Sequence, residues 1–119
     1  MATQPTPKVS SADVERVVHR DFPADRVADV LAILGEYGTE KWQREPDRVR
    51  LAALKLAEGS VELLRRHIET AKCDYRDVIA PAEYPNYSKS ILRVRELPAD
   101  EKQRIFDEDW KQYQEWLTW

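Results

Sequence analysis

The chain has 119 residues, of which 42% are hydrophobic and 34% are charged, and it carries a formal net charge of −3. This length is enough to bury one hydrophobic core, and no stretch approaches the roughly 18 consecutive apolar residues that a membrane-spanning helix needs. With only three glycines and many Ala, Leu, Glu, Arg and Lys residues, the composition favours helices over strands. We therefore predict an all-α fold, a single-domain bundle of five or six helices around a helical hairpin.

The single cysteine, Cys73, has no second thiol in the chain with which to form a disulfide. A reducing compartment suits such a chain, and the N-terminal residues lack the apolar run of a secretory signal. We therefore expect a cytoplasmic protein with no membrane contact, and no motif in the sequence calls for a cofactor.

The first nine residues, MATQPTPKV, are polar and contain two prolines. We predict a disordered tail over residues 1–9 and a single helical domain over residues 10–119. Ser10 followed three residues later by Asp13 is typical of a helix N-terminus, and valines then recur at helical spacing. The first helix is therefore expected to begin at the tail's end and to be short.

Two further helices are predicted over residues 23–37 and 46–58, because each begins near a proline and ends at a glycine. The second of these has apolar side chains on two faces, with Leu51 and Leu54 pointing away from the main stripe. Such a helix is either central in the bundle or covered by a partner.

Ser60 is expected to cap the longest helix, whose apolar seam alternates spacings of three and four residues. Pro81 removes a backbone donor, so it is expected to kink this helix or end it near Ala80. The short junction at Gly59 predicts that this helix pairs with the preceding one as the helical hairpin. The seam consists of Val61, Leu64, Ile68, Ala71, Tyr75, Val78 and Ala82.

The C-terminal third is predicted to hold a long last helix, preceded within residues 86–97 by either a short helix or an extended piece, of which we favour the helix. The last helix begins after Leu97 with the residues PADE, a proline and two acids in a first turn. Its apolar stripe is aromatic and consists of Phe106, Trp110, Tyr113 and Leu117.

The segment DYRDVIAPAEYPNY, residues 74–87, is the densest group of chemically versatile side chains in the chain. Its two prolines and core-facing positions explain it as a helix end, with tyrosines over one end of the bundle. As an alternative, these side chains wall a small ligand pocket or an enzymatic site. The pocket candidates are Asp74, Tyr75, Asp77, Tyr84 and Tyr87.

No metal site or catalytic group is predicted. His67 and Asp74 share a polar line on the predicted long helix, but seven residues separate them by roughly 10.5 Å along the axis. That distance is too long for both to bind one ion without help from elsewhere. Neither histidine lies in a known nucleophile or metalloprotease motif, so we do not favour an enzyme.

A nucleic-acid-binding regulator is a further alternative, because basic residues gather around the junction of the third and fourth predicted helices. The acidic net charge and the glutamates interleaved with these residues argue against it. The basic residues concerned are Arg44, Arg48, Arg50, Lys55, Arg65 and Arg66.

Large apolar side chains outside the predicted stripes point instead to a protein partner. The chain ends in WLTW, and aromatic side chains of this kind are commonly buried at protein interfaces. We therefore favour a non-enzymatic protein-interaction or homo-oligomeric module that binds itself or another protein. The interface candidates are Leu51, Leu54, Trp116 and Trp119.

Residues 45–85 resemble small uncharacterised bacterial proteins that share a segment R-V-R-x-A-x-L-K-L-A and a following D-Y-R-D-V. In this chain the two motifs occupy residues 48–57 and 74–78. The resemblance implies a bacterial cytoplasmic protein with the same helical core. It implies no activity, so it assigns no functional residue.

Overall fold

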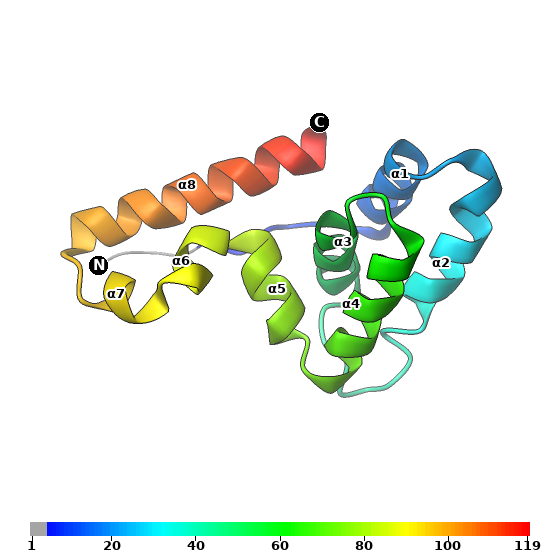
Figure 1. Ribbon diagram of the computed structural model, residues 1–119, viewed down its shortest axis with the longest axis horizontal. Helices are drawn as coiled ribbons and strands as arrows, with labels where there is room; N and C mark the ends of the chain where they lie inside the picture. Colours follow the sequence, from blue (N-terminus) through cyan, green and yellow to red (C-terminus); the bar gives the residue numbers. More distant parts are fainter. Residues whose placement is uncertain (1–4) are drawn as a thin grey trace.

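The computed structural model describes residues 5–119, which fold into eight α-helices and one short 3₁₀ turn without any strand (Figure 1). The all-α prediction is confirmed. The predicted count of five or six helices is too low, because two of the expected helices are each divided into two. The elements are α1 Ser11–Asp21, η1 Ala24–Arg26, α2 Val27–Gly35, α3 Pro46–Ala57, α4 Val61–Cys73, α5 Arg76–Glu83, α6 Pro85–Lys89, α7 Ile91–Arg95 and α8 Ala99–Thr118.

Helix α3 is the centre of the core and packs against α1, α4 and α5. Both of its apolar faces are covered, and Leu51 and Leu54 have no exposed surface. This burial decides between the two explanations of a helix that is apolar on two faces, because its own neighbours cover it. The fully buried side chains of α3 are Val49, Leu51, Ala52, Ala53, Leu54 and Ala57.

The predicted longest helix is broken at Asp74, which lies in extended conformation between α4 and α5. The Asp74 carboxylate accepts the backbone N–H of Arg76 at 3.0 Å and the Arg76 guanidinium at 3.0 Å. Such a local side-chain bond offers the backbone an alternative to continued helix. The apolar seam continues through the break, which is why spacing alone did not reveal it.

Pro81 lies inside α5, which runs on to Glu83 rather than ending near Ala80. The short helix expected within residues 86–97 is present as two pieces, α6 and α7, separated at Ser90. These small helices form one end of the molecule (Figure 1).

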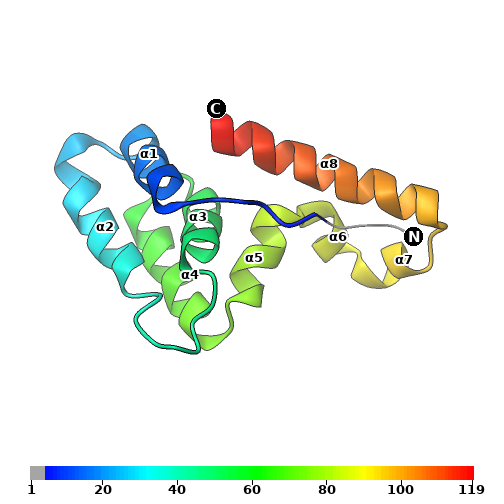
Figure 2. The same cartoon turned by 180° about the vertical axis from the view of Figure 1, so that it is seen from behind.

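Helix α8 runs along one side of the molecule, from the α6–α7 end to the neighbourhood of α1 (Figures 1 and 2). Its inner face carries the predicted Tyr113 and Leu117, both buried, and also Asp109, which is 1% exposed. The molecule is correspondingly elongated, with extents of 48 × 30 × 22 Å.

The predicted tail is only partly described, since residues 1–4 lie outside the described part. Residues 5–9 are extended and run across the α3 and α5 side of the molecule (Figure 2). Pro7 is buried and Val9 packs against the core.

Within residues 5–119, none of the helices combines the length and apolar character that crossing a bilayer requires.

Candidate functional site: a tryptophan-walled groove

A groove with a volume of about 590 Å³ opens where the C-terminal ends of α1, α3 and α8 meet. Because three helices end at one place, side chains distant in sequence share its walls. Its lining residues are Arg20, Asp21, Lys55, Glu58, Gly59, Gln112, Trp116 and Trp119.

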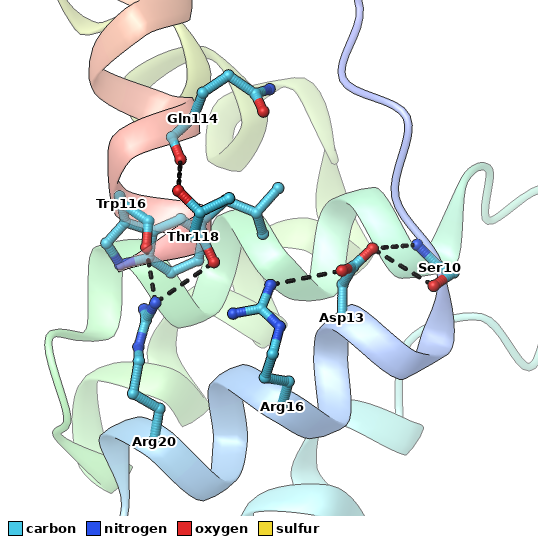
Figure 3. Close-up of polar contacts among 8 residues, drawn as sticks. Ser10, Asp13, Arg16, Arg20, Gln114, Trp116 and Thr118 are labelled. Atoms are coloured by element: carbon cyan, nitrogen blue, oxygen red, sulfur yellow. Dashed lines mark hydrogen bonds and ion pairs between the residues drawn. The ribbon is translucent and has the colours of Figure 1, made fainter.

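Arg20 holds the end of α8 against α1. Its guanidinium donates to the backbone carbonyl of Trp116 at 2.7 Å and to that of Leu117 at 3.4 Å (Figure 3). These carbonyls lie in the last turn of α8, where a cation interacts favourably with the negative end of the helix dipole. A bidentate pair with Asp21, at 2.7 and 3.2 Å, holds the same guanidinium in place.

Both tryptophans of the groove also stack on this guanidinium. The Arg20 carbon lies 5.2 Å from the Trp116 ring centroid and 5.6 Å from that of Trp119, within cation–π range. The Trp116 ring also contacts Tyr113 at a centroid distance of 5.6 Å. The tryptophan walls are therefore positioned by packing before any partner binds.

Trp119 is the most exposed large apolar side chain among the described residues, at 86% of its surface, while Trp116 is half-buried. Two other exposed side chains, Leu92 on α7 and Trp42 in the α2–α3 loop, line none of the described grooves. Tryptophan is enriched among the residues that contribute most of the binding energy at protein interfaces.

Lys55 and Glu58 carry the remaining charges of the groove; Lys55 lies in the last turn of α3 and Glu58 is the residue that follows the helix. Lys55 is half-buried and has no ion pair among residues 5–119. Burial lowers the pKa of its ammonium, and the nearby Asp109 and Glu58 only partly offset that effect. Glu58 is exposed and adopts a left-handed backbone conformation with φ of 49°.

The structure places the four interface candidates in two different environments. Trp116 and Trp119 line the groove, as the sequence suggested for the C-terminal helix. Leu51 and Leu54 are wrong as interface residues, because both are fully buried within the chain's own core. The face of α3 that seemed to lack a partner is covered by neighbouring helices.

The five pocket candidates of residues 74–87 lie in different environments. Asp74 is bound to Arg76, Tyr75 is half-buried, and Asp77 points to solvent. Tyr84 and Tyr87 meet edge-on with centroids 5.9 Å apart, and Tyr87 also contacts Phe106. No described groove brings all five of these residues together.

The cavity beside Tyr84 has a volume of only about 10 Å³, which is room for roughly one water molecule. Tyr113 lines the same cavity, and its buried hydroxyl has no hydrogen-bond partner within residues 5–119. Burial raises the pKa of this hydroxyl, so it stays protonated at neutral pH. The stretch that seemed the best pocket candidate is therefore chiefly a packed helix end.

Of the six basic residues of the nucleic-acid hypothesis, two are bound within the fold, whereas Arg44, Arg65 and Arg66 are exposed. Arg48 forms a bidentate pair with Glu83, with both distances 2.7 Å, and a further bond to Glu45. Arg50 donates to the carbonyls of Leu34 and Tyr37 at the end of α2. Arginines bound in this way are not available to phosphates.

No group of three or more His, Cys, Asp or Glu side chains in residues 5–119 is placed to hold a metal ion. His67 is half-buried, and burial lowers its pKa.

Comparison of the chain with protein-family models, curated proteins and solved structures found no match. The resemblance of residues 45–85 to bacterial proteins therefore stays a prediction.

Proposed function

We propose that this protein is a non-enzymatic interaction module that binds a second copy of itself through the groove lined by Trp116 and Trp119. The observation that carries the proposal is Trp119, which is 86% exposed and stacked beside a groove of about 590 Å³.

The free energy available from this side chain is substantial. An aromatic side chain buries roughly 150–250 Å², so covering Trp119 in both copies removes on the order of 300 Å² from water. At about 25 cal/mol per Å², this burial is worth roughly 7 kcal/mol, similar in size to the cost of association. Trp119 is therefore expected to dominate the affinity.

The charges of the groove favour a copy of the same chain over a strongly charged partner. Two cations, Arg20 and Lys55, and two acids, Asp21 and Glu58, line it. A surface with equal numbers of both signs attracts neither a polyanion nor a polycation, whereas it can complement itself.

The test compares Trp119→Ser with Leu92→Ser by light scattering across a concentration series. Leu92 is the matched control, because it is also highly exposed, at 73%, but lies on α7 away from the groove. We expect Trp119→Ser to weaken self-association at least about 30-fold, as for a hot-spot residue, and Leu92→Ser to leave it unchanged. Equal masses for both variants at every concentration would refute the proposed surface.

A further inference from the structure

Residues 5–9, with the sequence PTPKV, form an extended segment across the α3 and α5 side of the molecule, which we call the proline segment (Figure 2). Pro7 is buried and Val9 is half-buried, whereas Thr6 and Lys8 are exposed. Successive side chains of an extended chain point to opposite sides, so every second residue faces the protein. The proline segment therefore lies on the folded chain in the manner of a bound peptide.

Four aromatic side chains form the surface on which the two prolines lie. Together with Pro5 and Pro7 they line the cavity of about 10 Å³, so the prolines leave almost no open space between the rings. Proteins commonly recognise proline-containing segments with aromatic-lined grooves, because a segment that is already extended loses little conformational entropy on binding. This surface, which we call the aromatic slot, consists of Tyr84, Phe106, Trp110 and Tyr113.

Pro7 also lines a second groove, with a volume of about 580 Å³, to which Lys8 and Val9 contribute. Three carboxylates and only one arginine line this acidic groove beside Lys8. A cation directly after the second proline therefore complements the charge of the groove. The charged residues concerned are Asp13, Glu45, Asp47 and Arg48.

The proline segment is held without hydrogen bonds. Within residues 5–119, no hydrogen bond or ion pair joins it to the rest of the chain. In the aromatic slot, the buried hydroxyl of Tyr113 has no partner in the same part of the chain. A buried hydroxyl without a hydrogen bond costs free energy, which a backbone carbonyl of a bound segment recovers by accepting from it. The chain's own segment thus fits the slot by shape and leaves a donor for a competing segment.

We infer that the aromatic slot and the acidic groove bind an extended segment of another protein with the pattern Pro-x-Pro-basic-aliphatic, for which the proline segment is the chain's own competitor. The pattern is that of residues 5–9, the segment that occupies the site in this structure. The inference goes beyond the proposed function, because no residue of the Trp119 groove lines either the slot or the acidic groove.

A tethered competitor decides how the site is tested. It acts at a concentration of roughly millimolar, so a separate peptide binds well only when the tethered segment is displaced. Pro7→Asp displaces it, because an unpaired carboxylate is unfavourable at a buried position against aromatic rings. Thr6→Asp is the matched control, since it adds the same charge to the same segment at an exposed residue.

The probe is a fluorescein-labelled peptide PTPKVS, the sequence of residues 5–10, and its binding to the full chain is followed by fluorescence polarisation. We expect Pro7→Asp to bind the peptide at least about tenfold more tightly than the native chain, and Thr6→Asp to bind it like the native chain. Adding Trp110→Ala to Pro7→Asp is expected to weaken binding at least about tenfold, whereas adding Trp42→Ala, at an exposed loop tryptophan, leaves it unchanged. A peptide with both prolines replaced by alanine is expected to bind as weakly as PTPKVS binds the Trp110→Ala chain.

The indole N–H signal of Trp110 in ¹⁵N NMR spectra reports occupation of the slot directly. We expect it to move in Pro7→Asp and to return towards its native position when the peptide is added. A folded Pro7→Asp chain that binds no peptide at about 1 mM, or whose Trp110 signal does not move, would overturn the inference.

Two further measurements decide the remaining cases. If circular dichroism shows that Pro7→Asp is unfolded, the native chain is titrated with up to about 10 mM peptide, and a Trp110 signal that does not respond would overturn the inference. The second measurement is dilution of Trp119→Ser, in which the proposed self-association is absent. A Trp110 signal that changes on this dilution would assign the bound segment to a second copy and overturn the competition within one chain.

Discussion

Replacement of Glu83 by alanine is expected to destabilise the fold strongly, because this carboxylate is the buried link between α3 and α5. Its side chain is 3% exposed and accepts two hydrogen bonds of 2.7 Å from Arg48, whose side chain is 17% exposed. Desolvation raises the pKa of Glu83, while the guanidinium opposes that shift. The ionised form of the Glu83 carboxylate is therefore stabilised by Arg48.

The expected size of the effect follows from the geometry. Removal of one member of a buried ion pair typically costs 3–5 kcal/mol, because the other charge remains buried without compensation. Arg48 keeps a bond of 2.9 Å to Glu45, so we expect about 3 kcal/mol for Glu83→Ala. Glu83→Gln retains one acceptor oxygen and is expected to cost about half as much.

Urea unfolding followed by far-UV circular dichroism measures these differences, with all variants at one protein concentration because association adds to stability. The matched control is Glu45→Gln. It removes the negative charge of the other carboxylate that pairs with Arg48, on a side chain that is 49% exposed. That change is expected to cost less than about 1 kcal/mol. A loss for Glu83→Ala no greater than for Glu45→Gln would refute the reasoning.

Two further predictions concern other buried polar groups. Asp109 accepts the backbone N–H groups of Asn86 and Tyr87 at 3.0 and 3.1 Å, so Asp109→Ala, which leaves both donors without a partner, should lose about 2–4 kcal/mol in urea unfolding. The exposed Asp107 on the same helix is the control, and an equal loss for Asp107→Ala would contradict this. Burial lowers the pKa of His67, so the unfolded chain binds its proton more readily than the folded chain, and stability should fall as pH falls through the histidine range, from about 7 to 5. His67→Gln should reduce this pH dependence of the free energy of unfolding, whereas the control His19→Gln, at an exposed histidine, should not. An unchanged pH dependence in His67→Gln would contradict a lowered pKa for His67 in the folded chain.

The elements that were predicted well are those in which local signals agree. The first helix starts where Ser10 and Asp13 form their capping box, and α3 begins at Pro46 and ends just before Glu58 and Gly59, which adopt positive φ. In each case the cap and the apolar spacing mark the same boundary. Asp109 carried a usable signal too, since it lies four residues before Tyr113 on the buried stripe.

The groove was only half predictable, because its construction depends on distant contacts. Trp116 and Trp119 stand out in the sequence as large apolar side chains beyond the helical stripe. Arg20, which positions both, bonds to a residue 96 positions away, and no local pattern indicates that contact. Leu51 and Leu54 were assigned to a surface because periodicity shows that a face is apolar and does not show what covers it.

The central claim is that the chain associates with itself through an exposed tryptophan surface. Sedimentation equilibrium of the native chain, from about 1 μM to about 500 μM, tests it most directly. We predict a mass that rises from the 13.9 kDa of one chain towards twice that value. A mass of one chain over the whole range would contradict it.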